Sequence, residues 1–324
     1  MNILGLSVNK NAQKLVDRAI EDKENLCVQI EKGPLGCTII DAGVKARGGY
    51  AAGKLVTEIC LGGYGTASTI SMQYDQLTLP SIFVETDFPA IATLGSQFAG
   101  WKIEASNYFA MGSGPARALP KKPKEIYEQI QYEDHHDTAV IVLEAESYPT
   151  EEAVKTISDE CKISPRNLYA VVAPTSSVVG SIQISGRIVE TGIHRLSQVG
   201  LDPKLITHGC GYAPIPPIHP KAALAMGRTN DALYYGGVTF YTVNLESDNQ
   251  LRDIVSKAPS SCASAYGKPF YEILKEAKFD FYQIDPNIFA PAVIVANNAR
   301  TGTTIRSGKI DAKALKFMMG ITET

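Results

Sequence analysis

Residues 138–143, Thr-Ala-Val-Ile-Val-Leu, are the stretch that decides the fold. Its apolar side chains fall on both faces of an extended chain, which is typical of a central strand covered by helices on both sides. Thr150 then caps a helix, with Glu151 and Glu152 in the first turn, where acidic side chains favour the helix dipole. A buried strand followed by such a helix predicts an α/β fold.

The same alternation extends outward in both directions. A first helix is expected to begin at Asn9 or Asn11, and a strand at 37–40 is followed by a helix whose apolar residues run from 51 to 59 and which ends at Gly62-Gly63. Further strands are expected at 168–173, 181–189, 238–245 and 292–296, and further helices near 221–226, 249–257, 269–275 and 311–319.

The polar stretch 120–137 carries only a short helical piece and predicts a domain junction. Residues 1–134 and 138–324 are therefore expected to form two α/β domains. Residues 38–43 (Thr-Ile-Ile-Asp-Ala-Gly) resemble 187–192 (Arg-Ile-Val-Glu-Thr-Gly), and each is followed by a helix and a Gly-Tyr pair. These matches favour an internal structural repeat with a cleft between the halves, in which Asp41 corresponds to Glu190, although matches this short also arise by chance.

Charge and cysteine usage exclude several classes of function. The 324 residues hold 31 basic and 34 acidic residues, giving a net charge of −3 without a long basic run, so nucleic acid and anionic membranes are poor partners. No apolar run approaches the roughly 18 residues of a membrane span, and we expect a cytoplasmic protein. The six cysteines match no metal-ribbon spacing and are expected to be reduced and buried. His208, Cys210 and His219 match no zinc pattern, so no metal is expected.

Residues 181–192 carry the main candidate chemistry. If 181–189 form a strand, Ile182, Ile184 and Ile188 share one face, and Glu190 follows on the same apolar side. A bulge at Gly186 would bring Arg187 alongside the acid. Burial disfavours an ionised carboxyl and a guanidinium favours it, so Glu190 could activate water as a base. Before any family resemblance is considered, an ordinary surface ion pair is the commoner explanation of an Arg and a Glu this close in sequence.

Other polar and aromatic residues suggest ligand contacts. Ser113-Gly114-Pro115 resembles a glycine turn that leads into a helix and presents backbone N–H groups and Arg117 to an anion, although a plain turn fits the same residues. Arg300 lies in a polar loop after a strand, and Tyr64 and Tyr212 could stack on a planar ligand or pack in the core.

Six long strings give the sequence a resemblance over nearly its whole length to the methenyltetrahydromethanopterin cyclohydrolase family. These strings are Gly43-Val44-Lys45-Ala46-Arg47-Gly48-Gly49, Cys60-Leu61-Gly62-Gly63-Tyr64-Gly65, Gly112-Ser113-Gly114-Pro115-Ala116-Arg117-Ala118, Ala173-Pro174-Thr175-Ser176-Ser177, Gly186-Arg187-Ile188-Val189-Glu190-Thr191-Gly192 and His208-Gly209-Cys210-Gly211-Tyr212-Ala213-Pro214.

The resemblance implies a two-domain α/β homotrimer with a pterin site between the domains. It implies reversible hydrolysis of N5,N10-methenyltetrahydromethanopterin to the N5-formyl compound, in methanogenesis and one-carbon metabolism, without a metal or redox cofactor. The family's catalytic Arg and Glu match Arg187 and Glu190. The substrate tail carries phosphate and carboxylates, for which Lys45, Arg47, Arg117 and Arg300 are candidate partners. The alternative function is a pterin- or nucleotide-binding protein that does not hydrolyse its ligand.

Overall fold

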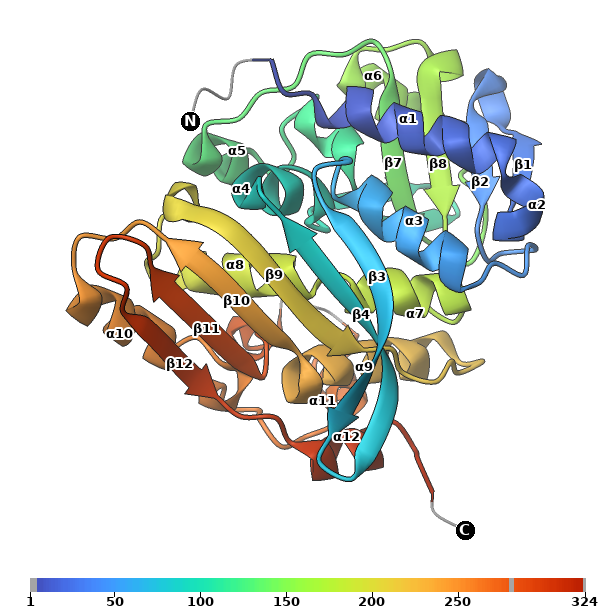
Figure 1. Ribbon diagram of the computed structural model, residues 1–324. Helices are drawn as coiled ribbons and strands as arrows, with labels where there is room; N and C mark the ends of the chain where they lie inside the picture. Colours follow the sequence, from blue (N-terminus) through green and yellow to red (C-terminus); the bar gives the residue numbers. More distant parts are fainter. Residues whose placement is uncertain (1–4, 280–282, 323–324) are drawn as a thin grey trace. The chain divides into compact units, whose positions relative to one another are not determined.

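The computed structural model describes residues 5–279 and 283–322, and its first half is built on a six-stranded sheet, here called sheet A (Figure 1). In spatial order its strands are β1 (Gln29–Lys32), β2 (Thr38–Asp41), β8 (Leu168–Val172), β7 (Ala139–Glu144), β6 (Tyr108–Ser113) and β5 (Trp101–Ala105). β2, β8 and β7 are parallel neighbours, whereas β1, β6 and β5 pair antiparallel. The strands expected at 37–40, 138–143 and 168–173 are confirmed as β2, β7 and β8.

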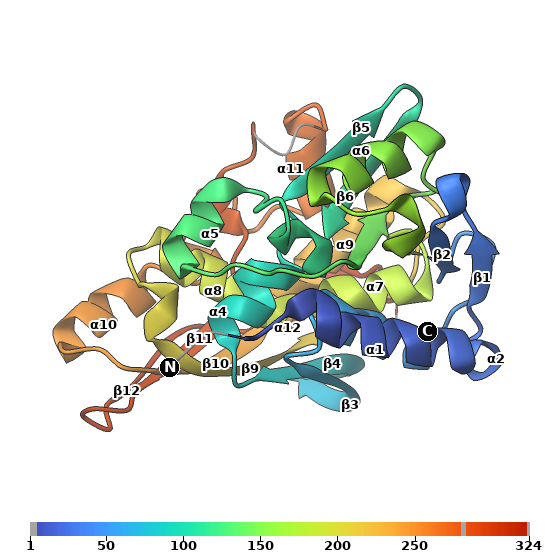
Figure 2. The same cartoon turned by 90° about the horizontal axis from the view of Figure 1, so that it is seen from above.

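β7 is buried on both faces, as its sequence predicts. Ile141 and Leu143 pack in one apolar cluster with α6 (Glu151–Cys161), while Val140 and Val142 pack in another with α1 (Val8–Glu21) and α3 (Tyr50–Cys60). α1 and α6 accordingly lie on opposite sides of the sheet (Figure 2). Each such side chain contributes about 1.5–3 kcal/mol through burial. Thr150 caps α6 by accepting a hydrogen bond from the Ala153 N–H at 3.3 Å.

A second six-stranded sheet, sheet B, occupies the other half of the fold. Its order is β12 (Thr304–Gly308), β11 (Val293–Asn298), β10 (Val238–Val243), β9 (Ile206–Pro214), β4 (Leu77–Thr86) and β3 (Thr66–Tyr74). β10 and β11 are parallel, and β9 is antiparallel to both of its neighbours. The helices expected in this half are confirmed as α9 (Ala222–Gly236), α10 (Asp248–Ser256), α11 (Phe270–Glu276) and α12 (Ala312–Met318). β10 and β11 confirm the two expected strands.

The strand expected at 181–189 is wrong. These residues form the end of α7 (Val178–Ser185) and the start of α8 (Ile188–Gln198). Almost every side chain from 179 to 193 is buried, so the segment has no polar face to show a helical period, and its β-branched residues favour a strand locally. The match of 38–43 with 187–192 therefore fails as well, because the first begins as a strand and the second is helical. Asp41 and Glu190 are not equivalent positions.

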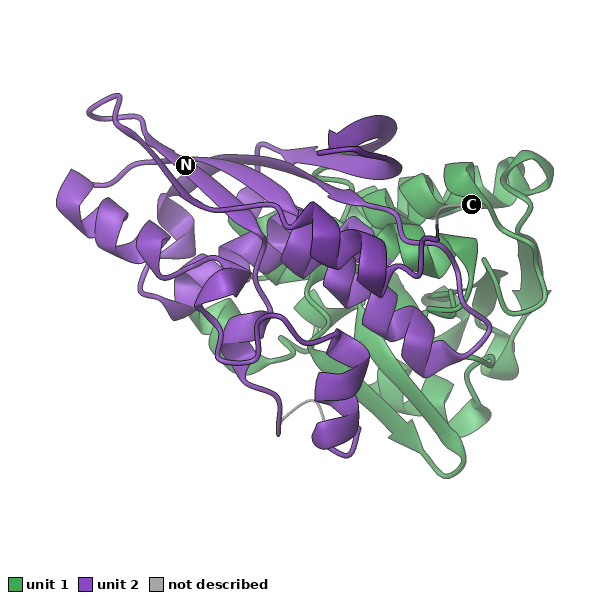
Figure 3. Cartoon of the chain, turned by 90° about the horizontal axis from the view of Figure 1, so that it is seen from below, with its two compact units in different colours: residues 1–66, 90–183 green, residues 67–89, 184–324 purple. Residues whose placement is uncertain are grey.

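The chain divides into two compact units, each with one of the sheets (Figure 3). Unit 1 comprises residues 1–66 and 90–183, and unit 2 comprises 67–89 and 184–324. The mixed α/β class with two sheet-bearing units is confirmed. The junction expected between 134 and 138 falls inside unit 1, because β7 follows it directly and pairs with β8 in sheet A. Further short helices along this part of the chain are α2 (Lys23–Leu26), α4 (Pro89–Ala92) and α5 (Lys124–Ile130).

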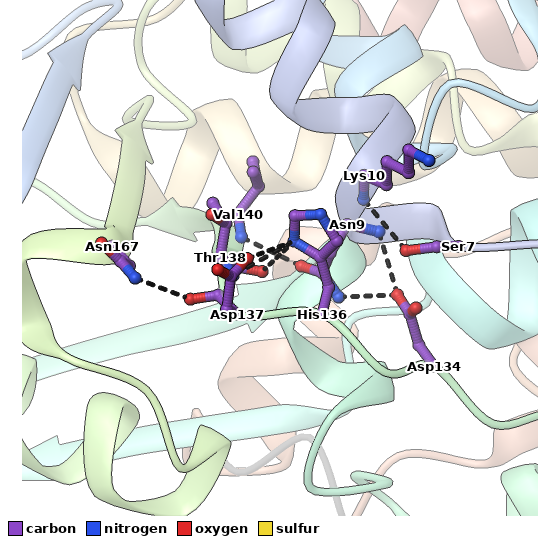
Figure 4. Close-up of polar contacts among 9 residues, drawn as sticks. All are labelled: Ser7, Asn9, Lys10, Asp134, His136, Asp137, Thr138, Val140 and Asn167. Carbon is purple, nitrogen blue, oxygen red and sulfur yellow. Dashed lines mark hydrogen bonds and ion pairs between the residues drawn. The ribbon is translucent and has the colours of Figure 1, made fainter.

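Buried hydrogen bonds tie the polar segment before β7 into unit 1 (Figure 4). The Asn9 side chain donates to the Asp134 carboxylate at 2.9 Å and accepts from the Val140 N–H at 3.1 Å. Asn9 is thus the second residue of α1, and the expected N-cap role belongs instead to Ser7, whose hydroxyl accepts from the Lys10 N–H. No helix in the described part of the chain is both long and apolar enough to cross a membrane.

Candidate active site

Arg187 and Glu190 open α8 in unit 2. Arg187 is the N-cap residue and Glu190 is the third residue of the helix. Residues three apart lie on one side of a helix, so both side chains leave the same side of its first turn. They are only 8% and 7% exposed. Arg187 and Glu190 therefore do not follow a strand, although the sequence predicted one. The start of a helix nevertheless places a nearly buried acid three residues after an arginine and on the same side.

Two buried tyrosines interact electrostatically with Glu190. Burial, with a contribution from the negative charges of Asp231 and Glu190, raises the pKa of Tyr234 on α9 far above its ordinary value. Burial and the charge of Glu190 likewise raise the pKa of Tyr241 on β10. The Tyr241 hydroxyl donates to the Val189 carbonyl at 2.8 Å and so fixes the first turn of α8 against sheet B. At this helix N-terminus the macrodipole favours an ionised carboxylate.

His194 follows Glu190 by one further turn. Burial, reinforced by the positive charge of Arg195, lowers the pKa of His194 to about 4. Its imidazole is therefore neutral at pH 7 and adds no positive charge to this side of α8.

Asp231 is a buried acid that the sequence analysis missed. Burial raises the pKa of its carboxyl to about 7, although the Phe270 N–H donates to it at 2.9 Å. It lies on α9 one turn before Tyr234 and adds to the charge felt by that tyrosine. The signal available in the sequence is an acid within the apolar stretch around Ala232 and Leu233.

A second polar region lies in unit 1, where the parallel strands β2, β8 and β7 end at one edge of sheet A. The chain leaves β7 towards α6 on one face and leaves β8 towards α7, which packs on the α3 face. Adjacent strand ends whose connections diverge in this way mark the usual ligand position of an open α/β sheet. The Thr175 hydroxyl donates to the Glu144 carboxylate at this edge. Lys45 and Arg47 lie exposed on the loop after β2.

Ser113, Gly114 and Arg117 face the interior of unit 1. The Gly114 N–H donates to the Ser96 carbonyl at 2.9 Å, and the Ser113 hydroxyl lies 3.4 Å from the Val142 carbonyl oxygen. Arg117 is wholly buried in a short 3₁₀ helix (Pro115–Ala118) and donates to the Leu94 and Ser96 carbonyls. The exposed position expected for a tail-binding arginine is therefore not the one that Arg117 occupies, because its guanidinium packs between aromatic rings inside the unit.

The remaining candidates are partly exposed. Tyr64 is half-buried just after α3 in unit 1, where its hydroxyl accepts from the Ser7 N–H at 3.1 Å. Tyr212 on β9 is half-buried, with its ring edge-on to Tyr74 at 6.4 Å between centroids. Arg300 is exposed and pairs with Glu246.

The cysteines differ in how far they are buried. All six cysteines are free, as expected, but their burial differs: Cys37, Cys60 and Cys161 are buried, Cys27 and Cys210 are half-buried, and Cys262 is exposed. Within residues 5–279 and 283–322, no group of three or more His, Cys, Asp or Glu side chains is arranged to hold a metal ion.

Comparison with known proteins agrees with the resemblance found in the sequence. The family model described as "Cyclohydrolase (MCH)" matches residues 7–317. A methenyltetrahydromethanopterin cyclohydrolase of Methanothermobacter marburgensis is 46% identical over 320 residues, 98% of this chain and 100% of the relative. Proteins of the same name from Methanocaldococcus jannaschii and Methanosarcina barkeri are 46% and 43% identical, each over 98% of this chain and 99% of the relative. This chain belongs to the MCH cyclohydrolase family.

Proposed function

We propose that this protein hydrolyses N5,N10-methenyltetrahydromethanopterin reversibly to N5-formyltetrahydromethanopterin. The observation that carries the proposal is the similarity over 98% of the chain to relatives named for this substrate. The nearly buried Arg187 and Glu190 on one side of α8 supply the groups that such a hydrolysis needs.

In the proposed reaction Glu190 acts as the base. The substrate carbon between N5 and N10 is electrophilic because the amidinium is cationic. Glu190 takes a proton from a water as its oxygen bonds to that carbon, and then gives this proton to N10 as the C–N10 bond breaks. The hydroxyl of the intermediate loses its proton to solvent as the formyl carbonyl forms, so one proton is released for each water consumed.

The surroundings of Glu190 suit this role. The helix N-terminus and a cationic substrate both favour its ionised form, and burial keeps bulk water from competing with the one that reacts. In the proposal Arg187 orients the carboxylate, since a guanidinium fork matches carboxylate geometry better than a lysine does. A positioned base of this kind contributes about 10²–10⁴-fold in rate.

We assign the anionic tail of the substrate to exposed cations. Lys45 and Arg47 have no carboxylate partner within 4.0 Å in the part of the chain that the structure describes. Arg300 would have to leave Glu246 to bind a phosphate or carboxylate. Tyr64 and Tyr212 remain candidates for stacking on the planar rings.

The proposal includes further features implied by the family. The reaction uses water alone, without a metal or redox cofactor, and belongs to one-carbon metabolism in the cytoplasm, including methanogenesis. The protein is a homotrimer, so light scattering should give a mass of three times 35.0 kDa. The activity is tested by the loss of methenyl absorbance when the purified protein meets the substrate. A wild-type protein that binds the compound without consuming it would contradict the proposed reaction.

A further inference from the structure

Asp41 is the last residue of β2 and lies where the parallel strands β2, β8 and β7 of sheet A end. It lies beside Val172 of the parallel strand β8, and its side chain is wholly buried. An isolated carboxylate in such a place would be strongly unfavourable, so its interactions indicate what it does there.

Five donors converge on the Asp41 carboxylate. Oδ1 accepts from the N–H groups of Gly43 and Val44 at 2.9 and 2.7 Å, and Oδ2 accepts from those of Lys45 and Ala46 at 2.8 and 2.9 Å. The Tyr148 hydroxyl also donates to Oδ2, at 2.8 Å. Burial alone would raise the pKa of Asp41, but the four backbone donors outweigh it and hold the pKa below the ordinary value.

The loop from 43 to 46 is therefore fixed by one side chain. Four successive backbone N–H groups that point to one place often bind a ligand's anion. Here the protein's own carboxylate fills that place, so these amides are not available to a substrate. Anion binding by this loop has to come from side chains.

The Asp41 carboxylate also fixes the Tyr148 ring, which lies next to the Lys45 ammonium. Lys45 Nζ lies 4.8 Å from the centroid of the Tyr148 ring, a distance at which a cation is attracted to a ring face. Because Tyr148 donates to Asp41, the backbone of Lys45 and the ring under its charge are held by one group. Lys45 is exposed and has no carboxylate partner within 4.0 Å among the described residues.

We propose that Asp41 is a positioning residue for substrate binding: it holds the 43–46 loop and Tyr148 so that the ammonium of Lys45 is presented to an anionic group, phosphate or carboxylate, of the substrate. This inference rests on the proposed function. It gives Asp41 no part in the chemical step, which it assigns to α8. Loss of Asp41 should therefore weaken binding and leave turnover largely intact.

Steady-state kinetics of Asp41→Asn, Lys45→Ala and the double variant test this role. Asn matches the size of Asp, but it carries no charge and one of its two terminal groups is a donor that faces N–H groups. We expect each single variant to raise KM about tenfold with kcat within twofold, as for loss of a hydrogen bond to a charged group. If Asp41 acts through Lys45, Asp41→Asn should raise KM by less than twofold in the Lys45→Ala background.

Salt dependence and two control variants separate positioning from folding. KM of the wild type should rise with ionic strength, and KM of Lys45→Ala should depend less on ionic strength. Lys155→Ala removes another exposed lysine of unit 1 and should leave KM and its dependence on ionic strength unchanged. Asp285→Asn removes a carboxylate that likewise accepts backbone N–H groups, but from Ser264 and Asn287 in unit 2, and should lower stability without raising KM.

Hydrogen exchange tests the loop without substrate. The amides of residues 43–46 should be protected in the wild type and should exchange at least tenfold faster in Asp41→Asn. If Asp41→Asn does not fold, Asp41→Glu keeps the charge but displaces it by one methylene, and it should show the same rise in KM.

The outcomes distinguish this inference from the proposed function. A wild type that does not hydrolyse the substrate overturns the proposed function. A wild type that does, together with a folded Asp41 variant whose KM is unchanged, overturns the positioning role. If Asp41→Asn raises KM by the same factor in the wild type and in the Lys45→Ala background, Asp41 does not act through Lys45.

Discussion

Glu190 lies one helical turn after Arg187 at the start of α8, and each side chain is more than nine-tenths buried. Two ionisable groups at the beginning of a buried helix are unfavourable unless charges and hydrogen bonds compensate them. In addition to burial, the charge of this glutamate raises the pKa of Tyr234 on α9 and of Tyr241 on β10. A cationic substrate would add a further favourable partner, which is why we place the chemical step here.

Arg187→Lys should impair turnover more than binding. Lysine keeps the positive charge but loses the planar fork that orients a carboxylate. We expect kcat to fall about 10- to 100-fold with KM within threefold, measured in the methenyl absorbance assay. Wild-type kinetics in this variant would show that the guanidinium does not orient the base.

Asp231 should make stability depend on pH with a definite sign. The unfolded chain releases this proton near pH 3.8 and the folded protein near 7, so the stability from this group is full below pH 3.8 and falls as the pH rises to 7. This difference in pKa between the folded and unfolded states corresponds to about 4 kcal/mol at most in the free energy of unfolding. Asp231→Asn keeps an acceptor for the Phe270 N–H and has no proton to lose, so it should gain stability relative to the wild type between pH 4 and 7.5 in urea titrations.

Asp285→Asn is the matched control for this experiment, because hydrogen bonds from Asn287 and Ser264 hold the pKa of Asp285 below its ordinary value in spite of partial burial. The stability that the ionised Asp285 gives the wild type is lost at low pH. The substitution should therefore be more destabilising at pH 7.5 than at pH 3. A pH-independent difference for Asp231→Asn would contradict the raised pKa of the buried Asp231 carboxyl.

Arg117→Lys should lower stability without changing substrate affinity. Arg117 donates to the Leu94 and Ser96 carbonyls, and its guanidinium lies 5.3 and 5.6 Å from the ring centroids of Phe98 and Tyr127. A lysine cannot make both sets of contacts, and we expect a loss of about 2–4 kcal/mol in chemical denaturation. A tenfold rise in KM at unchanged stability would instead make Arg117 a substrate contact.

Thiol alkylation and chelation should leave the activity intact. Burial raises the pKa of Cys37 to about 11 and that of Cys161 to about 12, so both stay protonated and unreactive at neutral pH. Iodoacetamide should modify the exposed Cys262 first, as mass spectrometry of peptides would show. Loss of turnover in step with alkylation, or after dialysis against EDTA, would favour a cysteine- or metal-dependent hydrolase.

Strong local signals in the sequence predicted most of the α/β scaffold. The apolar run at 138–143 and the cap at Thr150 specify β7 and α6 whatever their surroundings. α7 escaped prediction because burial on all sides removes the helical period. The glycines of 208–214 lie in β9, a strand that the sequence did not predict, and a Cβ on Gly211 would come within 2.6 Å of the Val238 carbonyl oxygen. That close approach belongs to a strand more than twenty residues away.

The candidate site was predicted by residue type and resemblance rather than by geometry. Arg187 and Glu190 were identified as candidates from a short segment that was predicted to be a strand and is helical. The carbonyl partners of Arg117 lie more than 20 residues away, and Tyr148, one of the five donors to Asp41, lies 107 residues away. The other four donors to Asp41 are local, but no local pattern encodes these distant contacts. The split of unit 1 around β3 and β4 likewise follows from pairing with the distant β9.

The initial rate of methenyl absorbance loss, compared between the wild type and Glu190→Gln, tests the central claim most directly. Gln keeps the size of the side chain but cannot take a proton from water. We predict a fall in rate of at least about 100-fold, with KM within threefold and an unchanged midpoint of unfolding. A variant that hydrolyses the substrate within a few-fold of the wild-type rate would contradict the assignment of Glu190 as the base.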